Sequence, residues 1–466
     1  MTEESKSAAA RQHGPLHSSK IVHNIGKNLH GLPIAMHAFL RLASGRSDLR
    51  FKVTVFTAVC LVGFFASYLL LMVPPYDQHG YVVGRDFVNT WMGARAVLSG
   101  RVGELFHIDV YMQALRSAFG PMPPHNWSYP PPLLLFIWPL GFLPYLAALA
   151  AWSLAGCAAY LGASAQSDRS LRTLAFVAVA PAVAVDLYSG QTGFFTAALM
   201  ILFWRDLEER PVRAGVFLGT MICKPHLVVL FPLALALSGR WRTFLAAGAS
   251  ALVLAAAAAL AFGADVWADY FRLVMPVQRG VLDTGTGFLS MMPTGFMGAR
   301  MLGASPAVAW WVQVPFTLLA VAAVAWTFRT RRDPTLSCAV LLTASVMVTP
   351  YAFNYDMVVF GWLAAVLWSR FDRKWDRVLL LSVWALPVAM LPLGDLHLPV
   401  SAPLLAVFLV RLVTKVRERE AAVQPSPSRE HQLWQSDLPI EPRSFIASVR
   451  RSITPSSPAR SQVRGS

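Results

Sequence analysis

The sequence predicts an all-α, polytopic membrane protein. Of its 466 residues, 55% are hydrophobic and only 14% are charged, whereas a soluble domain carries about 25% charged residues. Its apolar residues come in long runs, such as residues 51–73, 241–262 and 307–328, and a helix of roughly 20 apolar residues crosses a bilayer. These two observations exclude a single water-soluble globule.

The placement of the charges predicts the orientation in the membrane. The chain has 40 Lys and Arg residues against 25 Asp and Glu residues, a net charge of +15. Such an excess is also typical of nucleic-acid-binding proteins, but 32 of the 40 basic residues lie before residue 53, after residue 410, or in alternate short loops between apolar runs. These segments face the cytoplasm under the positive-inside rule. We therefore expect a plasma (inner) membrane protein with both termini in the cytoplasm.

The amino-terminal part is expected to form a basic cytoplasmic head (residues 1–50), an uncleaved first span and a polar outer loop (residues 74–132). Within this head, we expect a short stretch, residues 21–42, to lie at the membrane interface. In the outer loop, apolar residues from Phe87 onward recur at helical spacing and predict an amphipathic helix on the outer surface. Residues 109–119 predict a second such helix.

The middle of the chain has broken apolar runs. Residues 133–163 return the chain to the inside, but prolines divide them, and the sequence leaves open one crossing with a re-entrant piece or two short helices. Two pairs of short runs follow, with polar tips at residues 188–191 and 224–226. Broken helices are tolerated in a bilayer only where the tip is packed in protein or lines a wet cavity. The paired runs are 174–187 with 194–204, and 214–223 with 227–237.

The sequence after residue 240 predicts further membrane crossings. Residues 263–306, between two of these crossings, are expected to form a second stretch on the outer side. Length counting gives roughly 11 to 13 spans in a membrane domain of residues 51–414. Residues 415–466, rich in Pro, Ser and Arg, are expected to be a disordered cytoplasmic tail. The expected later crossings are residues 241–262, 307–328, 336–349, 357–368, 378–393 and 400–412.

Lys224 is the most costly residue within an apolar run, since a central cation costs about 2.5 to 3.5 kcal/mol on insertion scales. In a structural interpretation it snorkels or pairs with a carboxylate such as Asp186. In a functional interpretation it binds the phosphate of a lipid-linked donor, for which an ammonium beside a broken helix is suited. The sequence leaves both open.

Asp86 stands about a dozen residues past the first span. Its ordinary roles are a carboxylate at a helix N-terminus or an ion pair with Arg85 or Arg95; its functional role is a general base for an acceptor hydroxyl. Asn354, Tyr355 and Asp356 form a polar turn, and their ordinary role is to cap the helix that follows. The ordinary role of Tyr129 is to anchor the chain at the membrane interface.

The sequence contains no spacing of His, Cys and Asp typical of a metal site, and no glycine-rich phosphate loop. We expect the four cysteines to be small, buried apolar residues. We therefore expect neither a metal nor a cofactor, although the outer acidic residues leave room for a metal ion, and no nucleic-acid partner.

Several short motifs together resemble glycosyltransferase family 87, also described as the DUF2029 family, over roughly residues 50–412. In the first part these are Gly84-Arg85-Asp86-Phe87, Trp91, Ala94, Leu98-Ser99-Gly100, Tyr129-Pro130-Pro131-Pro132, Pro139-Leu140 and Leu143-Pro144. Later come Ser189-Gly190-Gln191, Ala214-Gly215, Gly219, Lys224-Pro225, Arg240-Trp241-Arg242, Thr349-Pro350-Tyr351 and Tyr355-Asp356.

The resemblance implies a GT-C-type fold and an enzyme that moves a hexose, such as mannose, from a polyprenyl-phosphate monosaccharide to a hydroxyl of a lipid or glycan acceptor. The reaction would run on the outer, periplasmic face with inversion. The family's catalytic carboxylate lies just after the first span, and Asp86 matches it. Family members that carry a His after the late Ser/Thr-Pro turn differ from this chain, which has Asn354-Tyr355-Asp356 there.

These expectations define a candidate site. Asp86 is the expected base, and Lys224, Arg279 and Arg95 are the expected ligands of the donor phosphate. A transporter or flippase of a lipid-linked substrate is the main alternative, because broken helices and a buried Lys suit it equally; a non-catalytic partner in envelope polysaccharide synthesis is a third. The candidates for the sugar or acceptor are Gln191, Asn354, Tyr355, Asp356 and Tyr129.

Overall fold

The computed structural model describes residues 48–284, 288–330 and 333–423, and in these residues every regular element is a helix. The prediction of an all-helical membrane protein is confirmed. The chain divides into a unit that ends at Val416 and a second unit that begins at Arg417. Of the second unit only the end of the last helix is described. The expected interfacial stretch at residues 21–42 lies outside the described residues.

Among the described residues, five helices are long and apolar enough to cross a membrane alone, and a bent pair makes a sixth if it counts as one span. The other apolar helices are shorter, so the predicted count of 11 to 13 spans stays a prediction. The five are α3 (Leu49–Leu71), α7 (Tyr145–Ala165), α13 (Trp241–Phe262), α17 (Pro306–Arg329) and α20 (Lys374–Asp395); the pair is α8 (Leu171–Ala178) and α9 (Pro181–Ser189).

Several helices are short, and the chain reverses direction inside the bundle after them. This happens at three turns: between α9 and α10, between α11 and α12 through two 3₁₀ helices, and between α18 and α19 through the 3₁₀ helix η8. Prolines at the first positions of α9, α11 and α18 favour these starts, because proline lacks the N–H that a helix interior needs. The elements are α10 (Gly193–Asp206), α11 (Pro211–Thr220), η5 (Met221–Cys223), η6 (Pro225–Val228), α12 (Phe231–Leu237), α18 (Pro334–Val348), η8 (Asn354–Val358), α19 (Val359–Leu367) and η9 (Trp368–Arg370).

The open question about residues 133–163 has an answer. A single long helix, α7, begins after Pro144, and the residues before it form short helical segments that pack against α4. Gly141 makes this packing possible, because a Cβ there would lie 2.8 Å from the carbonyl oxygen of Ala94. The short segments are η3 (Pro131–Leu133), α6 (Leu134–Ile137) and η4 (Trp138–Phe142).

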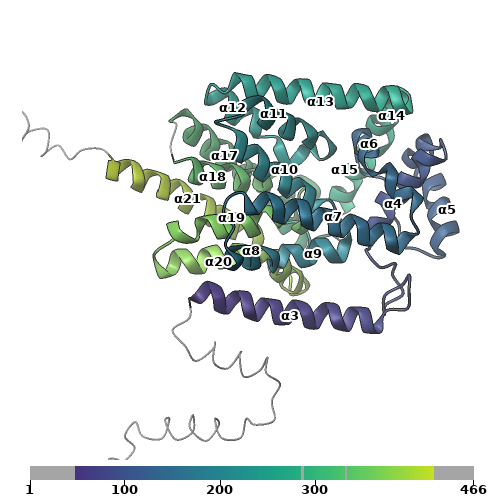
Figure 1. The fold of residues 1–466 in the computed structure, drawn as a ribbon, viewed down its shortest axis with the longest axis horizontal. Coiled ribbons are helices and arrows are strands. Elements are labelled where there is room, and N and C mark those ends of the chain that lie inside the picture. Colours follow the sequence, from purple (N-terminus) through teal and green to yellow (C-terminus); the bar gives the residue numbers. More distant parts are fainter. Residues whose placement is uncertain (1–47, 285–287, 331–332, 424–466) are drawn as a thin grey trace, which may run out of the picture. The chain divides into compact units, whose positions relative to one another are not determined.

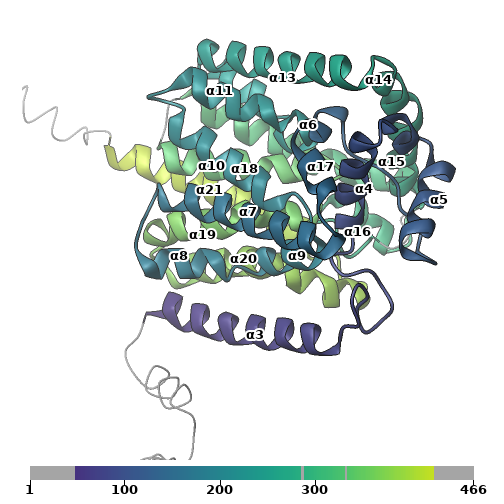
Figure 2. The same ribbon diagram turned by 45° about the vertical axis from the view of Figure 1, so that its right-hand side comes forward.

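The two outer stretches fold into helices at one end of the bundle. Figures 1 and 2 show α3 and α13 on opposite sides of the bundle, and α4, α5, α14 and α15 together at the end where α3 and α13 finish. The two helices predicted in residues 74–132 are confirmed as α4 (Phe87–Leu98) and α5 (Ile108–Phe119), joined by η2 (Val102–Phe106); their place on the outer side stays a prediction. The second outer stretch forms α14 (Asp265–Asp269), the π-turn η7 (Tyr270–Val274), α15 (Met275–Thr284) and α16 (Gly295–Met301).

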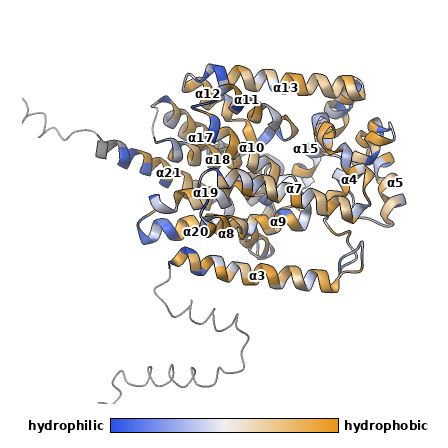
Figure 3. Cartoon of the chain, in the orientation of Figure 1, coloured by the Kyte–Doolittle hydropathy of each residue, from blue (hydrophilic) through white to orange (hydrophobic). Residues whose placement is uncertain are grey.

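Two main hydrophobic cores support this arrangement. One lies between the bundle helices and includes α10, α18 and α19, while the other lies under the outer helices and includes Phe87, Trp127 and Tyr145. Figure 3 shows hydrophobic residues along α3 and α13 and hydrophilic residues near the start of α20. The prediction that disorder begins at residue 415 was wrong in part, because α21 (Ser401–Val423) continues as a helix; residues 424–466 lie outside the described part.

Candidate active site

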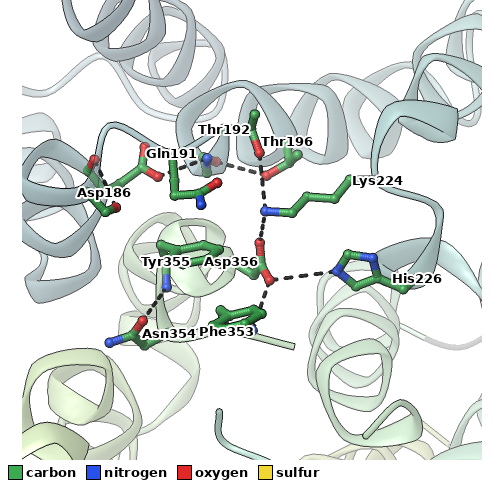
Figure 4. A network of polar contacts seen from close by, with 12 residues as sticks. Asp186, Gln191, Thr192, Thr196, Lys224, His226, Phe353, Asn354, Tyr355 and Asp356 are labelled. Carbon is green, nitrogen blue, oxygen red and sulfur yellow. Dashed lines mark hydrogen bonds and ion pairs between the residues drawn. The ribbon is translucent and has the colours of Figure 1, made fainter. Parts of the chain in front are cut away.

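The three turns within the bundle bring their polar residues together. The turn between α9 and α10 carries Gln191 and Thr192, the turn between α11 and α12 carries Lys224 and His226, and η8 carries Asp356. In Figure 4, Thr192, Lys224 and His226 all point toward Asp356. The sequence predicted polar tips at the first two turns, and the structure shows that the third turn meets them.

Lys224 is buried and forms an ion pair. Its Nζ lies 2.5 Å from Asp356 Oδ1 and 3.2 Å from Thr192 Oγ1, and it stands 4.7 Å from the centre of the Tyr355 ring. Pairing with a carboxylate was the structural interpretation, but the suggested partner was wrong. The partner is Asp356, not Asp186.

Asp186 has a different task. Its carboxylate accepts hydrogen bonds from the backbone N–H groups of Gly193 at 2.9 Å and Phe194 at 3.0 Å. These are free donors at the first turn of α10, where a negative charge is favourable. Asp186 therefore stabilises the start of α10 from the preceding helix, which leaves Asp356 to compensate Lys224.

The second oxygen of Asp356 is also occupied. Oδ2 accepts the backbone N–H of Phe353 at 2.9 Å and lies 3.9 Å from Nε2 of His226. Asn354 turns the other way: it is fully buried, and its side-chain amide donates to the carbonyl of Pro387 at 3.0 Å. Asn354 and Asp356 thus shape the turn, while Tyr355 packs beside Lys224.

Asp86 directly precedes α4 and is partly buried. Its side chain does not cap the helix, and neither suggested arginine is bonded to it. Arg85 donates to Asp77 Oδ2 at 2.9 Å and to the hydroxyl of Tyr188, and Arg95 donates to the carbonyl of Gly141 at 3.4 Å. Asp86 therefore stands at a helix N-terminus, as one of its ordinary roles predicts, but its carboxylate forms neither a cap hydrogen bond nor either of the suggested ion pairs.

Asp86 is instead linked to the turn between α9 and α10. Its backbone N–H donates to the carbonyl of Ser189 at 3.0 Å, and its Oδ2 accepts the side-chain N–H of Gln191 at 2.8 Å. Tyr129 donates its hydroxyl to the other end of the Gln191 amide at 2.6 Å. Burial, and then the nearby charge of Asp86, raise the pKa of Tyr129, so this phenol stays protonated.

A cavity of about 440 Å³, lined by both polar and apolar side chains, opens beside this network; its volume is typical of small-molecule sites. Several of the residues singled out from the sequence line it, whereas Asp86, Asn354 and Asp356 are not part of its lining. Arg95 lies elsewhere, in a shallow pocket of about 250 Å³ with Ser99 and Glu104. The polar residues that line the cavity are Ser128, Tyr129, Gln191, Lys224, His226, Tyr270, Gln278, Arg279, Tyr351 and Tyr355.

A second cavity of about 450 Å³ lies against the first and is lined mainly by apolar residues of α6, α7 and α10. Lys224 and Cys223 belong to the lining of both cavities. Lys224 therefore stands where this apolar groove meets the first cavity, which we call the polar chamber because it holds most of the polar side chains of the site. Sequence reasoning missed His226, although its place two residues after Lys224 in the polar tip was a signal.

Within the described residues, no group of three or more His, Cys, Asp or Glu side chains is placed to hold a metal ion. The charges of the site come from Lys224 and Arg279, with Asp86, Asp186 and Asp356 as the nearby acids. Such a site can deprotonate a hydroxyl and stabilise an anionic leaving group.

The comparison with protein families favours one of the classes of protein that remained open. The model of glycosyltransferase family 87 matches residues 127–350. This segment, slightly less than half of the chain, is similar to glycosyltransferase family 87. The expected resemblance is confirmed over these residues, and the match supports a membrane glycosyltransferase. No curated protein and no solved structure matches the chain.

The family 87 segment contains most of the cavity. Tyr129, Gln191, Lys224 and Arg279 lie within it. Asp86 comes before the matched residues, and the turn with Asp356 comes just after them. The role of Asp86 therefore depends on its geometry in this chain rather than on the family match.

Proposed function

We propose that this glycosyltransferase moves a hexose, with mannose as the first candidate, from a polyprenyl-phosphate monosaccharide to a hydroxyl of a lipid or glycan acceptor at the outer face of the membrane. The observation that supports this best is the position of Lys224 at the junction of the two cavities. A donor of this class has a long apolar chain, one phosphate and one sugar. The groove, the ammonium group and the polar chamber match these three parts in order.

In the proposed reaction, Asp86 takes the proton of the acceptor hydroxyl, and the oxygen attacks the anomeric carbon from the side opposite the phosphate. A new glycosidic bond forms as the bond from the anomeric carbon to the phosphate oxygen breaks, and polyprenyl phosphate leaves with its electron pair. The configuration at the anomeric carbon is inverted. A general base of this kind typically contributes a factor of about 10² to 10⁴.

The leaving phosphate needs positive charge beside it. Lys224 and Arg279 both line the polar cavity, and cations fixed in a site that excludes water stabilise developing negative charge strongly. Tyr355 and Tyr129 also line this cavity, and we expect them to contact the sugar. The proposed reaction uses no metal ion, because these side chains supply the charge compensation.

The proposal is tested by measuring transfer of radiolabelled sugar from polyprenyl-phosphate mannose, or glucose if the wild-type enzyme does not transfer mannose, to lipid and glycan acceptors in membranes. Asp86→Asn should fold normally and lower the rate by about 10² to 10⁴. Asp109→Asn, an exposed acid of α5 in the same outer loop, is the matched control and should keep full activity.

Full activity of Asp86→Asn would remove Asp86 from the role of base. Movement of the labelled lipid across the membrane without any covalent product would favour the transporter instead. The match to glycosyltransferase family 87 over residues 127–350 favours the glycosyltransferase over both the transporter and the non-catalytic partner.

A further inference from the structure

The side chain of Gln191 bridges two residues of the outer loop. Its Nε2 donates to Asp86 Oδ2 at 2.8 Å, and its Oε1 accepts the hydroxyl of Tyr129 at 2.6 Å. Both ends of the amide are therefore engaged with protein groups. The sequence suggested that Gln191 contacts the sugar, but the contacts of the side chain indicate another task.

The two hydrogen bonds fix the orientation of the amide. Tyr129 is buried and keeps its proton, so it donates to an acceptor, and the carboxylate of Asp86 accepts only from a donor. An amide turned by 180° would place its oxygen against the carboxylate and its NH₂ group against the phenol hydrogen. Tyr129 thereby forces the N–H of Gln191 toward Asp86.

Hydrogen bonds also hold the backbone around Gln191 in place. The indole N–H of Trp152 lies 3.2 Å from the carbonyl oxygens of both Gly190 and Gln191. The backbone N–H of Asp86 donates to Ser189 in the same turn. The segment that carries Gln191 and the segment that carries Asp86 are thus tied together at backbone and side chain.

We propose that Gln191 is a positioning residue that orients the carboxylate of Asp86, by holding Oδ2 and presenting Oδ1 to the acceptor hydroxyl. This inference rests on the proposed role of Asp86 as base. Tyr129 acts one step further away, by orienting Gln191.

The kinetic test separates positioning from sugar binding. Gln191→Leu removes the bond to Asp86 and should lower kcat by about 10- to 100-fold, the effect of losing a hydrogen bond to a charged group, while the KM for labelled polyprenyl-phosphate hexose stays within about twofold because uniform donor binding is untouched. Gln113→Leu, at an exposed glutamine of α5, is the control and should match the wild-type enzyme. A raised donor KM with unchanged kcat would overturn the inference and return Gln191 to the sugar.

Dependence on Asp86 is tested by combining variants. In an Asp86→Asn background, Gln191→Leu should cause no further loss of the residual rate, because its effect passes through Asp86. Tyr129→Phe should lower kcat less than Gln191→Leu, and the Tyr129→Phe/Gln191→Leu double variant should equal Gln191→Leu alone. Independent, multiplying losses would contradict the chain of contacts. If Asp86→Asn alone is fully active, the proposed function fails instead, so the two failures are distinguishable.

Gln191→Glu is a second variant that preserves size and the contact with Tyr129. It places another carboxylate against Asp86, and two carboxylates that share a site bind a proton more tightly. The acidic limb of the pH–rate profile should therefore move to higher pH than in the wild-type enzyme. An unmoved profile in the folded variant would show that Gln191 does not face a titrating base.

Discussion

Lys224 and Asp356 meet in the part of the bundle where an uncompensated charge is most costly. Their side chains are buried, and the 2.5 Å contact joins residues 132 positions apart in the sequence. Removing one member of a buried pair leaves the other charge unpaired and costs about 3 to 5 kcal/mol, whereas replacing both is often close to neutral. The pair therefore allows the structural role of Lys224 to be separated from its proposed binding of phosphate.

We expect Lys224→Met to lower both the unfolding temperature of the detergent-solubilised enzyme and its use of polyprenyl-phosphate donor. The Lys224→Met/Asp356→Asn double variant should recover most of the lost stability, because neither buried charge remains, but not the donor use. Thermal unfolding and the donor KM together check this. If the double variant recovers both the unfolding temperature and the donor use, Lys224 has only a structural role.

The sequence singled out several residues that the structure brings to one cavity, but it did not predict their contacts. The cost of a charge in an apolar run singled out Lys224, and its distance from the first span singled out Asp86. The partners of both residues were wrong or unknown, because apolar periodicity does not tell which turns of a bundle face one another. Asp186 was a reasonable partner for Lys224, but the free N–H groups of α10 occupy it.

At the scale of elements, the three turns inside the bundle create the site. The turn between α9 and α10 depends on Gly190, which has a left-handed conformation with φ of 64°. A Cβ at this position would lie 2.5 Å from the Cβ of Phe87, the residue next to Asp86. Gly190 therefore permits both the turn and its close approach to the beginning of α4.

Gly190→Ala should destabilise the protein more than Gly239→Ala. Gly239 has a similar φ of 68°, but a Cβ there would meet no atom within 4 Å. Both variants should lose about 1 to 2 kcal/mol through backbone strain, and Gly190→Ala should lose about 1 to 3 kcal/mol more through overlap with α4. Thermal unfolding compares the two, and transfer activity should fall only in Gly190→Ala. Equal losses of stability would show that the contact with Phe87 relaxes freely.

Long elements were predicted well and short ones poorly. The helix expected at residues 241–262 has those bounds, and the first span was placed within two residues. The helices of the second outer stretch were missed, because α14 and α16 are short and glycine and proline interrupt the sequence around them. The break before α7 stayed undecided for a related reason: proline marks an interruption but not the path that the chain takes afterwards.

At the scale of the whole molecule, the described part has a polar end built from the two outer stretches, which lie together beyond the ends of α3 and α13 (Figure 1). The alternating basic loops predicted this separation, since each long helix carries the chain from one side to the other. The central claim is that the end with Asp86 faces away from the cytoplasm, where a lipid-carried sugar and its acceptor meet.

The most direct measurement is labelling of single cysteines by a membrane-impermeant maleimide, in an active variant without the four native cysteines. Ser117 lies on α5 and Arg169 lies in the loop between α7 and α8, and both residues are exposed. A cysteine at either position is therefore accessible to a reagent on the same side of the membrane. We predict that Ser117→Cys reacts in intact cells and that Arg169→Cys reacts only after the membrane is permeabilised. Labelling of Arg169→Cys but not Ser117→Cys in intact cells would contradict the account.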